Sequence, residues 1–326
     1  MFLNSMNRLC AGLVAVAMTL ALAACGSSGA STGDETSSAA GVKQETISAS
    51  EVKELHDALP QEIKDKGEIS IGYQNTAGLP YGVVGDDGKD QGLNVDAANL
   101  IGEVLGVKVK GQGADFSQLI PGLQAGRYDL VTNITTDTAE RREVVDFIDV
   151  LYGEPSSLVV NKGSDQTGKT LNDVCGITIG VDSGSTHEEK AKAQAEQCAK
   201  EGKAELKVSA FKGVSNMLLA LKSNRVDAVY LSMGASRYYS KQDSQIQLSK
   251  SDGDIVELNG FMVAKGSELG PVVRKAMLHL NQDGTWKKLL DKYGLADLAP
   301  SDAVVENTEA NYQSLLDAAN NKSDKQ

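Results

Sequence analysis

The chain has 326 residues, of which 41% are hydrophobic, 5% aromatic and 23% charged, so it can bury one or two cores. Its formal net charge is −12 and its pI is about 4.8. An acidic chain without a basic stripe argues against nucleic acid as a partner.

The first segment, Met1–Ala24, is predicted to be a signal peptide. Its apolar run, Leu9–Ala24, is too short and too rich in alanine for a convincing membrane span. The run ends in Leu22-Ala23-Ala24-Cys25-Gly26, which resembles the lipobox of bacterial lipoproteins. Cleavage before Cys25 would leave its thiol lipidated, and two acyl chains suffice for stable anchoring. An ordinary secretory signal cleaved nearby is the alternative.

A flexible tether is expected to follow the lipidated cysteine, so that residues 25–48 form one unit. Gly26–Ser48 is dominated by small and polar residues and cannot form a core. As a random coil it would reach roughly 25 Å. We therefore expect a globular body held by its lipid at the outer face of the cytoplasmic membrane.

Strands and helices alternate along the first part of this body. The expected elements are a helix over Glu51–Lys66, a strand over Ile69–Tyr73, a helix starting in Gly92–Asp96, a strand over Val107–Lys110, a helix from Phe116 to Leu123 closed by Gly126, a strand over Asp129–Thr132 and a helix containing Ala139–Val145. Such alternation predicts βαβ units and a largely parallel sheet.

A second unit of the same kind is predicted after a crossover at Gly153–Ser157. Its strands are expected from Leu158 to Asn161 and over Ile177–Val181, Leu206–Ser209 and Asp227–Leu231, with helices over His187–Lys200 and Val214–Lys222. A late strand, Phe261–Ala264, and helices over Pro271–Gln282 and Thr285–Lys292 close the body. The polar remainder, 301–326, has room for a short helix over Tyr312–Ala319.

An internal echo supports two similar units. The stretch Leu123–Asn133 parallels Leu221–Leu231, since each places a helix end, a turn and Arg-x-Asp before an apolar strand. Two facing α/β units would bring the ends of these strands to a shared cleft, where ligands of open α/β sheets bind.

Two of the four cysteines are left for the body once Cys10 leaves with the signal and Cys25 takes the lipid. Outside the cytoplasm, Cys175 and Cys198 are expected to form a disulfide worth roughly 3 kcal/mol. Two independent buried thiols are the alternative. A metal site is not expected, because no histidine or further cysteine lies at ligand spacing.

Arg141 has an unusual position for a cation. With Thr138 as N-cap, it falls in the first turn of a helix, where the helix dipole disfavours positive charge. One interpretation is that Arg141 holds an anion such as a ligand carboxylate. The other is that Arg141 and Arg142 are solvated surface charges.

The loop Gly184-Ser185-Thr186 stands between a predicted strand and helix. Its small residues could present backbone N–H groups to a carboxylate or phosphate, with Thr186 as N-cap. It could equally be a simple helix cap. Catalytic motifs are lacking, and His187, beside the expected cleft, is interpreted as structural or solvated.

Together these segments resemble family 3 of the solute-binding proteins of ABC importers, the polar amino-acid-binding group with the type II periplasmic-binding fold. The resemblance covers about Gly67–Gly294. It rests on Gly92-Leu-Asn-Val-Asp96, on Phe116-Ser-Gln-Leu-Ile-Pro-Gly-Leu-Gln-Ala-Gly126, on Thr136-Asp-Thr-Ala-Glu-Arg141 with Asp146-Phe147, on Gly184-Ser-Thr186, and on Asp283-Gly284-Thr285-Trp286 with Tyr293-Gly294.

The resemblance implies an α/β protein of two lobes with a ligand cleft between them. Residues 49–156 would form the first part of lobe 1, 157–260 lobe 2, and 261–300 the return to lobe 1. In the family, the arginine that matches Arg141 pairs with the ligand α-carboxylate. The resemblance also implies roles for Thr136 and the Gly184, Ser185 and Thr186 loop in holding that group, for Phe116 as an apolar wall, and for Asn75 and Tyr81 near the ligand side chain.

Two departures from the family pattern bear on the solute. An aromatic residue that the family often carries in the first loop is replaced by Ala77 and Gly78. The aspartate that usually receives the ligand α-ammonium is replaced by Ser232. An unpaired ammonium would lose about 1.5–3 kcal/mol. Either another acid replaces it, or the solute is not an ordinary α-amino acid.

The function expected from these features is a non-enzymatic receptor without a cofactor. It would be a monomer that captures an amino acid or related carboxylate by lobe closure and docks on an ABC permease in the membrane. One alternative is a dehydratase-like enzyme on the same fold, which would need an acid in the cleft; Ser232 and the lack of an obvious acid argue against it. A sensory or adhesive lipoprotein is the other alternative.

Overall fold

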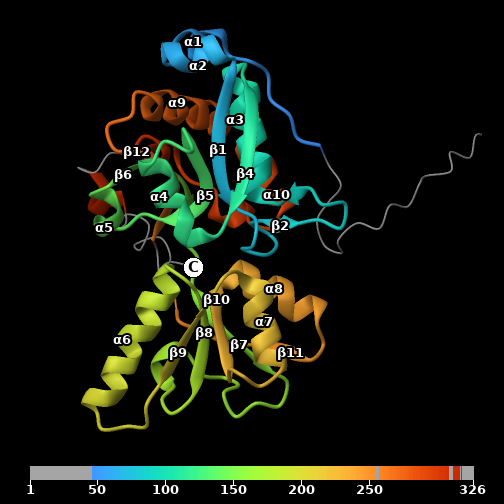
Figure 1. Ribbon diagram of the computed structural model, residues 1–326, viewed down its shortest axis with the longest axis vertical. Coiled ribbons are helices and arrows are strands. Elements are labelled where there is room, and N and C mark those ends of the chain that lie inside the picture. Colours follow the sequence, from blue (N-terminus) through green and yellow to red (C-terminus); the bar gives the residue numbers. More distant parts are fainter. Residues whose placement is uncertain (1–45, 254–256, 308–310, 316, 318–326) are drawn as a thin grey trace, which may run out of the picture. The chain divides into compact units, whose positions relative to one another are not determined.

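The computed structural model describes residues 46–253, 257–307, 311–315 and 317 (Figure 1). The expected signal peptide, the lipidation site Cys25 and most of the tether lie outside these residues, as do parts of the expected helix over Tyr312–Ala319. In the part of the chain that is described, no helix has the length and apolar character needed to cross a membrane.

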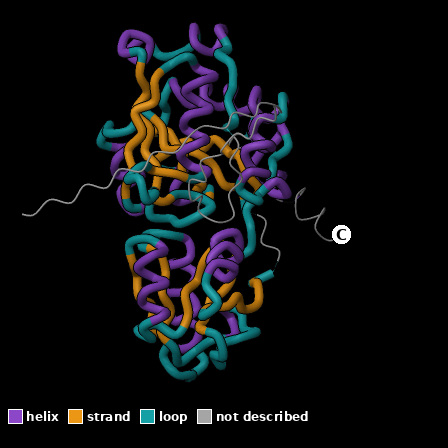
Figure 2. Tube along the Cα trace, turned by 90° about the vertical axis from the view of Figure 1, so that its right-hand side faces the viewer, coloured by secondary structure: helices purple, strands orange, loops and turns teal. Residues whose placement is uncertain are grey.

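Two five-stranded sheets, each flanked by helices, form the framework (Figure 2). The first has the order β4-β1-β5-β12-β6 and the second β11-β7-β10-β8-β9. The strands of the first are β1 Glu68–Gln74, β4 Lys108–Ala114, β5 Leu130–Thr136, β6 Val145–Tyr152 and β12 Leu258–Ala264; those of the second are β7 Ser156–Asn161, β8 Thr178–Asp182, β9 Lys207–Phe211, β10 Ala228–Ser232 and β11 Ile246–Ser251. A small pair, β2 Val83–Val84 and β3 Asp90–Gln91, follows β1.

Each sheet is largely parallel, as predicted, with one strand that runs in the opposite direction. In the first sheet β12 runs antiparallel to β5 and β6, and in the second β7 runs antiparallel to β10 and β11. The antiparallel strands β7 and β12 are those that follow a passage from one sheet to the other.

The chain leaves the first sheet after Tyr152, enters the second at Ser156 and returns at Leu258, so that each sheet forms the centre of one lobe. Ser156 and Leu258 come slightly before the lobe boundaries expected at 156/157 and 260/261. Residues 254–256 of the second expected crossover, Asp254–Gly260, lie outside the described part.

The helices complete the two lobes. Lobe 1 has α1 Lys53–Asp57, α2 Gln61–Lys66, α3 Leu93–Leu105, η1 Phe116–Gln118, α4 Leu119–Gln124, α5 Ala139–Arg142, α9 Leu269–Gln282, α10 Thr285–Lys292, η3 Ala296–Leu298 and α11 Asp302–Val305. Lobe 2 has η2 Leu171–Asp173, α6 Thr186–Lys200, α7 Val214–Lys222 and α8 Met233–Gln242. The expected ranges of α7 and α10 are confirmed, whereas α8 and β11 were not anticipated.

Two expected helices are shorter than predicted. The segment Glu51–Lys66 is broken at Pro60, which caps α2 because proline can start a helix but cannot continue one. The helix expected over Ala139–Val145 ends at Arg142, and Val145 already begins β6. Val145 is fully buried in the sheet, so packing rather than local preference decides its conformation.

The internal echo has a structural basis. Gly126 and Asn224 both adopt positive φ after a helix, and both are followed by Arg-x-Asp. Asp129 and Asp227 then make the same pair of hydrogen bonds to a neighbouring strand. The Asp129 carboxylate accepts from the Ser70 N–H at 2.8 Å, and the Asp129 N–H donates to the Ser70 carbonyl at 2.8 Å. The Asp227 carboxylate accepts from the Thr178 N–H at 2.7 Å, and the Asp227 N–H donates to the Thr178 carbonyl at 2.8 Å. These aspartates hold β5 against β1 and β10 against β8, and so place the ends of β5 and β10.

Each lobe has its own core. In lobe 1, Trp286 is fully buried, packs edge-on against Phe261 and donates a 2.7 Å bond from Nε1 to the Val150 carbonyl. In lobe 2, the expected disulfide between Cys175 and Cys198 is present, with a Cα–Cα distance of 5.8 Å. It joins the segment before β8 to α6, and the alternative of two independent thiols is wrong.

Candidate functional site

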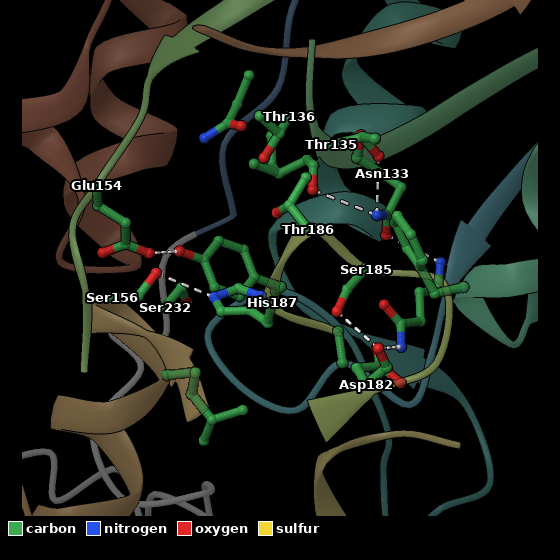
Figure 3. Close-up of a pocket in the computed structure, with 18 of the residues that line it drawn as sticks. Asn133, Thr135, Thr136, Glu154, Ser156, Asp182, Ser185, Thr186, His187 and Ser232 are labelled. Carbon is green, nitrogen blue, oxygen red and sulfur yellow. Dashed lines mark hydrogen bonds between the residues drawn. The ribbon is translucent and has the colours of Figure 1, made fainter. Parts of the chain in front are cut away.

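A polar pocket is lined by residues of both lobes (Figure 3). Its volume of about 130 Å³ is small beside the roughly 300–1,000 Å³ of drug-sized sites, which suits a small solute. From lobe 1 the lining includes Gln74, Ala77, Tyr81, Phe116, Asn133, Thr136 and Arg141. From the crossovers and lobe 2 it includes Glu154, Ser156, Asp182, Ser185, Thr186, His187, Lys190, Ser232 and Glu257. Of the expected binding residues, Asn75 and Gly184 are not part of this lining, and the others are.

Arg141 is a buried cation, so its interpretation as a solvated surface charge is wrong. The predicted N-cap is confirmed: the Thr138 hydroxyl accepts a 3.2 Å bond from the Arg141 N–H. Arg141 is only 8% exposed. Its guanidinium donates to the carbonyls of Thr136, at 2.9 Å, and Gly184, at 3.2 Å. Burial lowers the pKa of Arg141 from its ordinary value, against the opposing effect of nearby acids.

The guanidinium of Arg141 has no carboxylate partner among the described residues, and it lies 5.4 Å from the ring centre of Phe116. Arg142 differs, because it pairs with Asp137 at 3.2 Å and lies over Tyr312. A buried guanidinium that faces a pocket and holds only main-chain carbonyls can still receive a bidentate anion.

The loop before α6 is arranged differently from the expectation. Ser185, not Thr186, is the N-cap, because Ser185 has the extended backbone of a cap while Thr186 already begins the helix. Gly184 donates its N–H to Glu188 at 2.7 Å and its carbonyl accepts from Arg141, so this residue serves the loop rather than the pocket. Ser185 and Thr186 line the pocket.

The first loop of lobe 1 contributes Tyr81 but not Asn75. The Asn75 amide donates to Asp90 at 2.8 Å and is absent from the lining of the pocket. Tyr81 points its hydroxyl at Glu154, to which it donates a hydrogen bond. Ala77, one of the two residues that replace the aromatic residue of the family pattern, lines the pocket.

Acidic side chains line the pocket, including Glu154 and Asp182, so another acid is available at the place where the sequence has Ser232. Glu154 accepts from Tyr81, from the Ser232 hydroxyl and from the Gly234 N–H at 2.6 Å. Asp182 accepts from the Gln74 amide at 2.6 Å and from the Gly213 N–H at 3.0 Å. Burial raises the pKa of both Glu154 and Asp182, and the hydrogen bonds that they accept oppose this rise.

A third acid of the pocket, Glu257, is neutralised within the protein. It pairs with Lys190 at 2.8 Å. No group of three His, Cys, Asp or Glu side chains in the described residues is placed to hold a metal ion.

His187 lines the pocket, and its ring is held by contacts with other residues of lobe 2. Its Nε2 is 3.1 Å from the Ser156 hydroxyl, and its ring packs edge-on against Tyr230. Burial, with smaller effects of Lys190 and Arg141, lowers the pKa of His187 to about 3. The imidazole is therefore neutral at physiological pH and adds a polar but uncharged wall.

Glu154, Asp182 and Gln74 were missed because no local motif marks them. Glu154 lies in the Gly153–Ser157 crossover and Asp182 at the end of β8. The available signal was positional, since residues of a crossover and residues at strand ends meet where two α/β lobes face each other.

Two α/β lobes joined by two crossings, with a pocket of polar groups lined from both sides, define a class of protein: the two-lobed receptors for small solutes. Residues 69–296 match the bacterial extracellular solute-binding proteins, family 3, and the chain belongs to this family.

Curated relatives are amino-acid-binding proteins. The chain is 25% identical to the arginine-binding protein ArgT of Corynebacterium glutamicum over 82% of this chain and 87% of that protein. It is 29% identical to the arginine-binding extracellular protein ArtP of Bacillus subtilis, over 86% and 95%.

A solved structure of an ancestral arginine-binding protein bound to arginine has 34% identity and a TM-score of 0.64, and covers 70% of this chain and 98% of that one. The two-lobed α/β fold expected from the sequence is thereby confirmed.

Proposed function

We propose that this protein is a lipid-anchored, extracytoplasmic solute-binding protein of an ABC importer. It captures an amino acid or a related small carboxylate between its lobes and delivers it to membrane permease subunits. The observation that carries the proposal is Arg141, a buried guanidinium that faces a polar pocket without a carboxylate partner among the described residues.

The carboxylate of the solute would bind beside Arg141. Thr136, Ser185 and Thr186 surround this end of the pocket with hydroxyl groups, and Phe116 supplies an apolar wall. The relatives that bind arginine, and a further one named as an L-cystine-binding protein, support an amino acid as the solute.

A thermal-shift screen tests the binding function. The mature chain carrying Cys25→Ser, which stays unlipidated, is screened against amino acids, their derivatives and carboxylates without an α-amino group. A ligand at 100 times its Kd should stabilise the protein by about 2.7 kcal/mol. We expect Arg141→Ala to abolish the shift, because the carboxylate loses its charged partner.

Arg127→Ala is the matched control, since Arg127 is exposed and lies on a different part of lobe 1. A shift that survives in Arg141→Ala would contradict the assignment of the carboxylate site. Absence of any shift across the screen would leave a sensory or adhesive lipoprotein as the better explanation.

The acids in the pocket make the enzyme alternative worth one assay. One solved neighbour is titled as an ancestral amino-acid-binding protein, a precursor of cyclohexadienyl dehydratase, at 27% identity and a TM-score of 0.61. The proposal expects no product from prephenate or arogenate. Product that disappears in Glu154→Gln would favour a dehydratase.

The anchor is tested separately from binding. Cys25→Ser should move the protein from the membrane fraction to the medium or periplasm, because the acyl chains supply the attachment. An unchanged distribution would favour an ordinary secretory signal.

A further inference from the structure

We propose that Glu154 receives the ammonium group of the solute, so that the pocket selects molecules carrying both a carboxylate and an ammonium group. The inference rests on the proposed function, because it needs a solute bound at Arg141. Ser232 carries no charge and cannot pair with an ammonium group, so the inference assigns that pairing to Glu154.

The charges of the pocket leave a place for a cation. Lys190 and Glu257 neutralise each other at 2.8 Å. Arg141 has no anionic partner, and neither Glu154 nor Asp182 forms an ion pair with a cationic side chain among the described residues. The exposed Arg237 acts on Glu154 only through its charge. A solute with one negative and one positive group would therefore pair Arg141 and one of the two acids.

The hydrogen-bond partners of the two acids decide which one suits an ammonium group. An ammonium has three N–H donors and no acceptor. Glu154 is held by the hydroxyls of Tyr81 and Ser232 as well as by the Gly234 N–H. Each hydroxyl keeps acceptor lone pairs while it donates. An ammonium beside Glu154 therefore finds three acceptors: one carboxylate oxygen and two hydroxyl oxygens.

Asp182 offers a poorer environment. Its partners are the Gln74 amide and the Gly213 N–H, both of which donate. The Gln74 amide presents its NH2 group to Asp182 rather than its carbonyl oxygen. Asp182 is better explained as a bridge between the lobes, because Gln74 belongs to β1 and Asp182 to β8.

Figure 3 places the two acids apart. Glu154, Ser156 and Ser232 lie together on one side of the pocket, while Asp182 and Ser185 lie on the other. Substitutions at Glu154 and Asp182 can therefore be compared as two acids of one pocket in different surroundings.

The experiment compares pairs of probes that differ only at the α-position. L-arginine, L-histidine and L-glutamine are each measured by calorimetry beside the 2-hydroxy acid in which a hydroxyl replaces the ammonium group. The protein is the mature chain with Cys25→Ser. For at least one pair, we expect the wild type to bind the amino acid about 10- to 100-fold more tightly than the hydroxy acid, the size of a charge-assisted hydrogen bond.

Glu154→Gln should remove this preference while hydroxy-acid binding persists, which also shows that the variant is folded. Asp182→Asn should alter both affinities of a pair by a similar factor and keep their ratio. Ser232→Asp added to Glu154→Gln should restore much of the preference, because it returns a carboxylate to the same end of the pocket.

The inference is overturned if Glu154→Gln keeps the preference, if Asp182→Asn removes it instead, or if the wild type binds the hydroxy acids at least as tightly. These results would leave the carboxylate site at Arg141 intact. If neither member of any pair binds and no compound of the thermal-shift screen does, the proposed function fails and this inference fails with it.

Discussion

Asp149 is a buried acid of lobe 1 with an incomplete set of hydrogen bonds. It is 1% exposed, its Oδ2 accepts from Asn307 at 2.6 Å, and its Oδ1 has no hydrogen-bond partner in the described residues. Burial raises its pKa to about 6, although Asn307, Arg274 and Arg142 act in the opposite direction. The ionised carboxylate is therefore less stable in the folded protein than in the unfolded chain.

The sign of the pH effect follows from this shift. The folded pKa of about 6 lies above the unfolded value of 3.8, so the folded state holds the proton more tightly. The stability associated with the protonated form is present below about pH 4 and is lost as the pH rises through 6.

Asp149→Asn should remove this dependence. We expect the variant to be more stable than the wild type by about 1–3 kcal/mol near pH 7 and to differ little near pH 4, in urea unfolding at both values. Asp165→Asn, at an exposed position, is the control. Its free energy of unfolding should lie within about 0.5 kcal/mol of the wild-type value at both pH values. A variant that is less stable than the wild type at pH 7 would contradict this prediction, because it would mean that the ionised Asp149 carboxylate stabilises the folded protein.

At the scale of elements, the disulfide and the helix boundaries show two kinds of constraint. The disulfide acts at a sequence separation of 23 residues and ties α6 to the segment before β8. The boundaries of α2 and α5 instead depend on single residues, Pro60 and Thr138, that start a helix.

Replacing both cysteines by serine should lower the free energy of unfolding by about 3 kcal/mol, mainly because the unfolded chain regains loop entropy. Chemical denaturation with and without reductant measures this. The reductant should lower the stability of the wild type and leave the double variant unchanged. Equal stability of wild type and double variant without reductant would contradict the expected contribution.

At the scale of the whole described body, the lobes approach each other through backbone as well as side chains. The Val214 N–H donates to the Thr76 carbonyl at 2.9 Å, and Lys212 pairs with Asp115 at 3.0 Å. Gly213 makes this approach possible, since a Cβ on it would lie 2.5 Å from the Thr76 Cβ and 2.6 Å from its carbonyl oxygen.

Gly213→Ala should therefore weaken solute binding, because the added methyl group pushes the lobes apart. We expect a Kd about 10-fold higher, besides a loss of stability of roughly 1–3 kcal/mol from the positive φ of this residue. Calorimetry with the ligand found by the screen gives the first value and thermal unfolding the second.

Gly202→Ala is the comparison, since Gly202 also has a positive φ but nothing lies within 4 Å of its added Cβ. It should lose stability and keep its affinity. Equal affinities of the two variants would mean that the close approach at Gly213 has no part in binding.

The sequence by itself determined the two-lobed α/β fold and singled out the pair Cys175 and Cys198 and the arginine Arg141. These features carry local signals: Arg-x-Asp before an apolar strand, paired cysteines behind a secretory segment, and an arginine in the first turn after the N-cap Thr138. The same signals did not reveal that Val145 begins a strand or that Ser185 is the cap of α6, because packing and backbone conformation decide such boundaries.

Only the tertiary structure decided which acids face the pocket. Glu154 meets Tyr81 and Ser232, and Asp182 meets Gln74, across distances in the sequence that no motif spans. Asn75, in contrast, turns to Asp90. A side chain on a loop or strand end can point to either side at similar local energy, so its direction is set by the partners that the folded lobes bring to it.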